Sequence, residues 1–498
     1  MTVTPTAQAI AAENATSGAA RPTASAPVGF WRTCFPTWQA LLAALLVCVI
    51  VPTSLIGLHI HENPQLSPID EAAHYDYVSR IADGGFPRLG QFLLPSTLHL
   101  ISCTGTALAT SAPHCPGSSN PKSYAGGGYQ YEAQQPPTYY AATVPIRWVG
   151  DHLFGMSPLT AARAGGVLWM SAGLILLWMA GRIVGLSVIR LVPAMLVLAC
   201  GPVAIYESAI VSNDAASIFA GALIGFLGAL AWARPGRWTL PVLAAGAFLV
   251  TSLKLNDALA VVVVSATFAI IWWRDSRAVA TTLTPRSSVW IRQWAPNGGA
   301  LLLGALVCVV LWVVVNRQLD LIDPRSLPTF DVLRTQPVTI SQIARESLLM
   351  LNPLGGSFSL FRTTASGGLR GSALSLNLQQ ITATALQYML LAGGVAALFV
   401  RRRIWAHWVG LTSIVTLYVG GIVLGVALFR TYSSDPSISG RYGLAVAPFL
   451  ALALVATIRG RWVVLAVVSA SVALVGLTYY YAVAVSYTHL TLPTILLV

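Results

Sequence analysis

Charge is scarce in this sequence of 498 residues: only 9% are Asp, Glu, Lys or Arg, and lysine occurs twice. Soluble domains carry about 25% charged residues, so this composition excludes an ordinary soluble protein. Apolar residues make up 55% of the chain, and the mean hydropathy is +0.69. These values predict an integral membrane protein.

Two local patterns are also missing. The chain has no glycine-rich P-loop (GxxxxGK followed by Ser or Thr), which argues against nucleotide hydrolysis. Residues 1–28 are rich in Ala, Thr, Ser and Pro but lack the apolar run of a signal peptide. We therefore expect a disordered cytoplasmic tail there.

The last residues, VSYTHLTLPTILLV, break the pattern that precedes them. VSYTHLTLPT resembles the translation of a sequencing adaptor, so residues 485–498 are predicted to be a non-native tail. This leaves residues 29–484 as the transmembrane domain.

Apolar runs recur along most of that domain, and they are long enough for helices that cross a hydrocarbon core of roughly 30 Å. Because a spanning segment must satisfy its own backbone hydrogen bonds, the prediction is an all-α polytopic fold. Eleven spans are expected, at residues 39–60, 160–181, 191–209, 216–232, 239–255, 258–273, 298–316, 382–400, 406–428, 442–458 and 462–482.

Arginines mark every second connection between these spans, as the positive-inside rule requires if the N-terminus is cytoplasmic. They are Arg182, Arg190, Arg234, Arg237, Arg274, Arg277, Arg286, Arg292, Arg401 to Arg403, Arg459 and Arg461. The net charge of +12 is then an orientation signal and gives no evidence for nucleic acid binding. The same topology puts two large loops, residues 61–159 and 317–381, on the exterior. Loops of that length are usually functional.

Two of the six cysteines, Cys103 and Cys115, lie in the first exterior loop. In an oxidising compartment they are expected to form a disulfide that staples the loop. Two free thiols are the alternative. The other cysteines lie in spans or just before one.

The most charged stretch is SPIDEAAHYDY, at residues 67–77. Ser67 as an N-cap hydroxyl, Pro68 at the first helical position and Asp70 near the positive helix end predict a helix that starts here. Apolar side chains between the charges suit a helix on the outer membrane surface. They are Ala72, Ala73, Val78, Ile81 and Ala82.

On that helix His74 follows Asp70 by four residues and Glu71 by three, so at least one carboxylate shares a face with the imidazole. The plain alternative is that Asp70 only caps the helix and Glu71 is solvated. Asp76 is predicted to be a solvated neighbour.

The segment YQYEAQQPPTYY, residues 129–140, combines polar and aromatic side chains. Glu132, Gln135 and Tyr139 suit a sugar-like ligand, because tyrosine offers both a ring face and a hydroxyl. A proline-braced turn into the next helix is the alternative.

Three further polar spots fall at predicted exterior helix ends: Asn213 and Asp214 in VSND, Lys254 in SLKLND, and Arg441 in SGRYG. Ionisable groups at membrane depth usually face a cavity or a partner. The alternatives are that Lys254 snorkels to the surface and that Arg441 pairs with Asp435.

Taken in order, PIDEAAHYDY, YEAQQPPTYY, VSND, the lysine of SLKLND and the GRY of the tenth span resemble the bacterial family of domain of unknown function 2142. The resemblance covers roughly residues 30–460. This family in turn resembles the C-type (GT-C) glycosyltransferases, polytopic enzymes that take sugars from polyprenyl-phosphate donors. The chain differs from the family pattern at Leu253 and Ser439.

The resemblance implies a bacterial inner-membrane glycosyltransferase that moves a sugar from a polyprenyl-phosphate to a cell-envelope glycan or lipid acceptor on the exterior face. Asp70 is then the general base, with Glu71 as a substitute and His74 as a supporting group. Lys254 and Arg441 would face the leaving phosphate. The other substrate-binding candidates are Glu132, Gln135, Tyr139, Asn213 and Asp214.

A divalent metal, Mg²⁺ or Mn²⁺, shared by Asp70, Glu71 and Asp214 stays open. Two other functions stay open as well. A flippase for lipid-linked glycans would show internal repeats or broken helices. A surface-polysaccharide polymerase or ligase would rely on exterior arginines such as Arg362 and Arg370.

Overall fold

In a computed structural model, most of the chain from residue 29 to residue 476 is described. The described ranges are 29–67, 70–106, 113–281, 285–323, 339–354, 388–399, 404–432, 438–458, 460, 462–473 and 475–476. Arg362, Arg370, Asp435, residues 1–28 and the tail 485–498 lie outside them.

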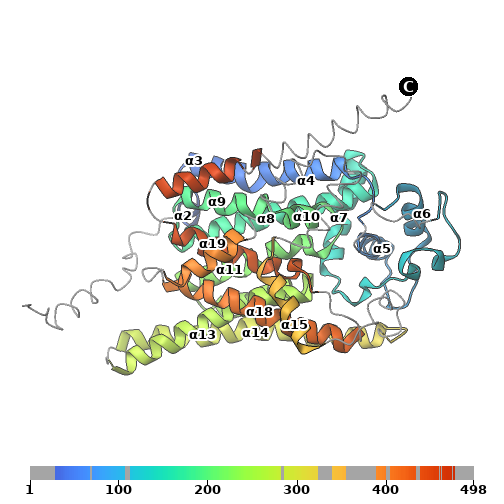
Figure 1. The fold of residues 1–498 in the computed structure, drawn as a ribbon. Coiled ribbons are helices and arrows are strands. Elements are labelled where there is room, and N and C mark those ends of the chain that lie inside the picture. Colours follow the sequence, from blue (N-terminus) through green and yellow to red (C-terminus); the bar gives the residue numbers. More distant parts are fainter. Residues whose placement is uncertain are drawn as a thin grey trace, which may run out of the picture.

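Helices account for all regular structure in these ranges, and the only β pairings there are two isolated bridges, Leu66 with Thr106 and Phe92 with Tyr129. The longer helices run side by side in one bundle (Figure 1). They are α3 (Trp38–Leu45) continuing through a π turn into α4 (Val51–Glu62), α7 (Thr138–Phe154), α8 (Pro158–Ile183), α9 (Val188–Ala199), α10 (Pro202–Ala209), α11 (Ser217–Ala233), α12 (Thr239–Leu253), α13 (Ala258–Thr281), α14 (Pro285–Leu319), α18 (Ile404–Tyr432) and α19 (Ala447–Thr457).

Seven helices in the described ranges are long and apolar enough to cross a membrane, or eight if one bent pair counts as a span. The chain is therefore a multi-pass membrane protein. The other three predicted spans coincide with shorter apolar helices, Thr239–Leu253, Tyr388–Ala397 and Trp462–Ala473. A helix of 15 residues is only about 22 Å long, less than the thickness of a hydrocarbon core.

The bent pair is α9 and α10, whose axes differ by 60° across Cys200 and Gly201. Proline follows at residue 202, and a residue before proline avoids the helical conformation, so the break falls where the sequence dictates it. The predicted span 191–209 is thus a broken helix.

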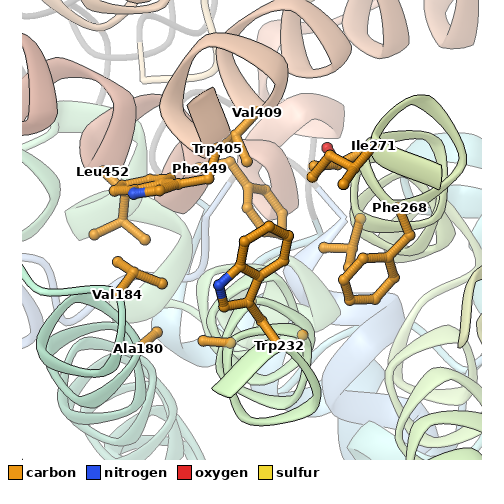
Figure 2. A pocket seen from close by; sticks show the side chains of 14 residues that line it. Ala180, Val184, Trp232, Phe268, Ile271, Trp405, Val409, Phe449 and Leu452 are labelled. Carbon is orange, nitrogen blue, oxygen red and sulfur yellow. The ribbon is translucent and has the colours of Figure 1, made fainter. Parts of the chain in front are cut away.

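An apolar pocket lies between α8, α11, α13, α18 and α19. Trp232 stands in the middle of its lining, with Val184 and Leu452 on one side and Phe268 and Ile271 on the other (Figure 2). Since α8 ends at Ile183 and α11 at Ala233, the pocket lies near those helix ends.

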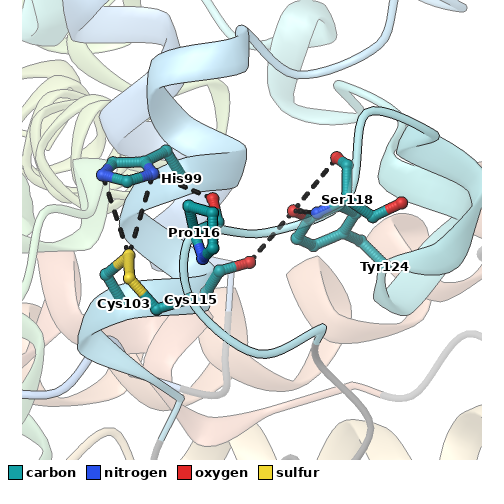
Figure 3. The surroundings of a disulfide bond; sticks show 7 residues. His99, Cys103, Cys115, Pro116, Ser118 and Tyr124 are labelled. Carbon is teal, nitrogen blue, oxygen red and sulfur yellow. Dashed lines mark hydrogen bonds between the residues drawn. A yellow bond between two sulfur atoms is a disulfide. The ribbon is translucent and has the colours of Figure 1, made fainter.

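At the other end of the bundle lies a region that we call the loop end, which comprises the described residues 63–67, 70–106 and 113–137. Here α5 (Glu71–Ala82) is seen end-on, across the long helices, with α6 (Pro95–Thr104) beside it (Figure 1). Cys103 at the end of α6 forms a disulfide with Cys115, the pair named from the sequence (Figure 3). His99 packs on Cys103 Sγ and bonds the carbonyl of Pro116 (2.9 Å).

The prediction that a helix starts at Ser67 is wrong, because α5 begins at Glu71. The Ser67 hydroxyl bonds to the Tyr206 hydroxyl of α10. The prediction that α5 lies on the outer membrane surface with one face free is also wrong. Most residues of α5 are buried, and the helix packs against α6, α7 and the short 3₁₀ turn η4 (Glu132–Gln134).

Candidate functional site

Asp70 precedes α5 and has a left-handed backbone with φ of 58°. In the described part of the chain it is the one residue other than glycine with a positive φ. Such a backbone costs about 1–3 kcal/mol and persists where its surroundings impose it. The side chain makes no capping bond, so the alternative that Asp70 merely caps the helix is wrong. Its carboxylate accepts from Tyr131 (3.1 Å) and Arg441 (3.0 Å).

Arg441 comes from a 3₁₀ segment, η10 (Gly440–Val446), that leads into α19. Besides Asp70, it faces Glu207 Oε1 on α10 at 3.6 Å and Asp214 Oδ2 at 3.8 Å. The Arg441 guanidinium thus links the loop end, through Asp70, to α10 and to the segment before α11. The alternative of a pair with Asp435 concerns a residue outside the described ranges.

Lys254 caps the end of α12 and forms a buried ion pair with Asp214, which lies in η5 (Asn213–Ala216) before α11. Only 4% of its side chain is exposed, so the alternative that Lys254 snorkels to the surface is wrong. Its Nζ lies 5.1 Å from the ring centre of Tyr442, and the guanidinium carbon of Arg441 lies 5.4 Å from the same ring. The ring of Tyr442 therefore lies within cation–π distance of both cations.

His74 stacks on Tyr140 of α7, and its Nδ1 lies 2.8 Å from that tyrosine hydroxyl and 3.9 Å from Glu132 Oε2. His74 therefore belongs to the same cluster as Asp70. Asp70 stands outside α5 with a left-handed backbone, so the helix spacing noted in the sequence does not account for its place beside His74. Tyr140 and Glu132 come from the segment at 129–140.

The carboxyl groups of Asp70 and Glu132 have pKa values that are shifted in opposite directions. Burial raises the pKa of Asp70, but the charges of Arg441 and His74 and the hydrogen bonds from Arg441 and Tyr131 outweigh burial and hold that pKa below its usual range. Burial and the Asp70 charge raise the pKa of Glu132 to about 8. Burial lowers the pKa of His74 to about 4, so this histidine is neutral at pH 7. One carboxylate is therefore ionised beside a protonated carboxyl group.

Gln135 and Asn213 are joined directly by a side-chain bond of 3.1 Å. The backbone carbonyl of Gln135 also accepts from Tyr77 (3.0 Å). Tyr139 is fully buried and packs edge-on against Tyr140. The structure thus brings Asp70, His74 and the predicted binding residues into one connected region.

Glu71 is the exception. It is fully buried, and both of its oxygens bind Arg163 of α8 at 2.7 Å. The backbone N–H groups of Ser67 (2.7 Å) and Val211 (3.0 Å) donate to the same carboxylate. With all its acceptor positions used, Glu71 is an anchor of the loop end, which does not fit the predicted substitute base or the alternative of a solvated side chain.

Asp76 is likewise not the solvated neighbour that was predicted. It is fully buried and accepts from Arg80 (2.6 Å), the backbone of Leu94 (2.6 Å), Thr97 (3.0 Å) and Gln130 (3.0 Å). Because Gln130 directly precedes Tyr131, the Asp76 carboxylate holds in place the segment that contacts Asp70.

The three carboxylates named for a metal do not form a metal site. Glu71 faces Arg163, Asp214 faces Lys254, and Asp70 faces Arg441. No group of three His, Cys, Asp or Glu side chains in the described ranges is arranged to hold a metal ion.

Three ionisable residues of this region were not singled out from the sequence: Arg163, Glu207 and Asp257, all buried inside apolar helices or at their ends. Each is a charge in an apolar run, which is a signal for a functional or structural partner. Among the described residues, one oxygen of Glu207 and one of Asp257 find no hydrogen-bond partner. Tyr131 and Tyr140 sit in the quoted tyrosine-rich segment but were not predicted as site residues.

Compared with known proteins, the chain matches no family model and no curated protein. Its function has to be inferred from the geometry of the cluster around Asp70 and Arg441.

Proposed function

We propose that the chain is a membrane glycosyltransferase of the GT-C kind, with Asp70 as the general base. The observation that carries this proposal is the accessibility of Asp70. Its side chain is 28% exposed, whereas that of Asp214 is 3% exposed and that of Glu207 is 4% exposed. A group that takes a proton from an acceptor hydroxyl has to be reachable.

In the proposed reaction the acceptor hydroxyl attacks the anomeric carbon of the donor sugar. The new glycosidic bond forms as the bond between that carbon and the phosphate oxygen breaks. The hydroxyl proton passes to Asp70, and the polyprenyl phosphate leaves with the bonding electrons. Arg441 and Lys254 are the cations near enough to stabilise its growing negative charge.

The pairing of both cations with carboxylates sets a condition on donor binding. A donor phosphate would have to share Arg441 with Asp70, which would weaken the Asp70–Arg441 pair. Because Arg441 lowers the pKa of Asp70, this exchange would raise that pKa and make Asp70 a stronger base. Donor binding would thus activate the base.

The proposal is tested in proteoliposomes with a panel of polyprenyl-phosphate donors, each carrying one radiolabelled hexose or pentose, and a cell-envelope extract as acceptor. Asp70→Asn is expected to abolish transfer while expression and folding stay intact. Asp83→Asn is the matched control, since Asp83 is an exposed aspartate at the other end of α5. Wild-type transfer by Asp70→Asn would exclude Asp70 as the base.

A transporter of lipid-linked glycans is a second candidate, because α9 and α10 form a broken helix of the kind that lines transport sites. The second half-helix carries Glu207 towards Arg441. Flipping of a fluorescent polyprenyl-phosphate sugar, followed by quenching from one side of the vesicle, separates the two functions. Transfer to an acceptor without movement of donor supports the enzyme, and movement without transfer supports the transporter.

A further inference from the structure

The apolar pocket lies far from the cluster around Asp70. Asp214 precedes α11, whereas Trp232 lies in its last turn, so about 27 Å of helix separate them. The pocket and the candidate site are therefore at opposite ends of the bundle.

The lining is almost wholly hydrocarbon. The lining includes the buried side chains of Phe268, Ile271 and Phe449, and on the α11 side Gly225 lets Phe449 approach closely. Trp232 is 37% exposed at the end of α11, and Trp405 stands near the start of α18. Tryptophans at helix ends are typical of the boundary between head groups and acyl chains. The pocket thus lies just below that boundary, at the depth of acyl chains.

Two arginines lie at the same end. Arg182 precedes Val184 of the lining, and Arg234 follows Trp232. Burial raises the pKa of the Cys34 thiol, and the positive charges of Arg182 and Arg234 offset part of that rise. Both guanidinium groups therefore lie near α2 (Phe30–Cys34). Arg182 donates to backbone carbonyls of Thr33 and Leu186, and in the described residues neither arginine pairs with a carboxylate.

We infer that this pocket binds one acyl chain of an anionic phospholipid, with the head group at Arg182 and Arg234. The hydrocarbon lining accepts the chain, and unpaired positive charge above it selects the anionic head group. This site is separate from the proposed glycosyltransferase chemistry and stands or falls independently of it.

The test uses the full chain in nanodiscs that contain phosphatidylglycerol with a photoreactive diazirine at the end of one acyl chain. Mass spectrometry of the cross-linked peptides is expected to place the label on pocket residues such as Trp232, Phe268 and Leu452. If the label is found only on lipid-facing residues outside the pocket, the inference is wrong, regardless of how the pocket variants behave.

Val409→Trp is expected to fill the pocket and remove most of this label. Val415→Trp is the matched control, because Val415 lies on the same helix and is 50% exposed outside the pocket. Equal labelling of the two variants would contradict the proposed site.

Arg234→Gln tests the head group. It is expected to reduce the preference for phosphatidylglycerol over phosphatidylcholine about fivefold, the effect of one arginine at an anionic surface. Arg237→Gln, three residues further along, serves as its control. Equal labelling of wild type by both phospholipids, or stronger labelling by a polyprenyl phosphate probe, would overturn the choice of ligand.

Discussion

Asp70 Oδ2 lies 3.0 Å from Arg441 Nη2, although 371 residues separate them in the chain. The contact joins the start of α5 to the segment before α19. It defines the candidate site, because Arg441 also faces Glu207 and Asp214, and Asp214 in turn pairs with Lys254.

Arg441→Lys is expected to keep the positive charge but lose the simultaneous contacts with three carboxylates. A guanidinium can face Asp70, Glu207 and Asp214 at once, whereas a lysine has one nitrogen. Sugar transfer should fall by about 10- to 100-fold, the effect of one hydrogen bond to a charged group. Arg345→Lys, an exposed arginine on α15 (Ile340–Ser347), should leave the rate unchanged. Unchanged transfer by Arg441→Lys would show that its charge alone suffices.

Removal of Arg163 should destabilise the protein strongly. Arg163→Met leaves the Glu71 carboxylate buried without its cation, which costs about 3–5 kcal/mol. Adding Glu71→Gln should restore part of the loss, because no charge then stays buried. Thermal unfolding in detergent measures both variants, with Arg88→Met at an exposed position as the control. A double variant less stable than Arg163→Met would contradict this account.

Glu132 should make the stability fall as pH rises. Its pKa of about 8 lies above the ordinary 4.5, so the folded protein keeps a proton that the unfolded chain releases between those values. The pKa of His74 is lowered from 6.5 to about 4, so this residue makes the free energy of unfolding fall as pH falls from 6.5 to 4. Below pH 6.5 the effects of Glu132 and His74 on the free energy of unfolding therefore have opposite signs. Between pH 6.5 and 8 only Glu132 of the pair contributes.

Glu132→Gln should therefore flatten the dependence of unfolding free energy on pH from 6.5 to 8, by up to about 1.4 kcal/mol per pH unit. The comparison is made by denaturation of both proteins at matched pH values. Asp151→Asn, at an exposed position on α7, should keep the wild-type slope. A wild-type slope in Glu132→Gln would mean that Glu132 is ionised in the folded protein.

The disulfide should stabilise the loop end. It closes a loop with a sequence separation of 12, for which about 3 kcal/mol is expected. Dithiothreitol should lower the melting temperature of wild type to that of Cys103→Ser with Cys115→Ser. The double variant should not respond to the reductant, and an equal shift in both proteins would point to a different cause.

The sequence was informative where a residue stands out from its neighbours. Lys254 and Arg441 are charges at the ends of apolar runs, and they do meet near Asp70 and Asp214. The membrane class and the apolar segments could be predicted from composition and run length. The catalytic roles remain predictions.

Other features depend on contacts that no local pattern encodes. Glu71 and Asp70 are adjacent acids, yet one is saturated by Arg163 and the other is accessible, and only the packing of α8 against the loop end decides which. The left-handed backbone of Asp70 and the burial of Asp76 are likewise set by distant partners. The predicted span 239–255 coincides with α12, although that helix of 15 residues is shorter than a hydrocarbon core is thick.

The bond between Glu71 and Arg163 also imposes an order on biosynthesis. The two residues are 92 positions apart, so Glu71 leaves the ribosome before its cation has been made. At roughly 5–20 residues per second, this carboxylate waits about 5–20 seconds for the helix that neutralises it. The loop end can close only after α8 has been inserted. The Asp70–Arg441 contact waits longer still, so the candidate site is one of the last parts of the chain to assemble.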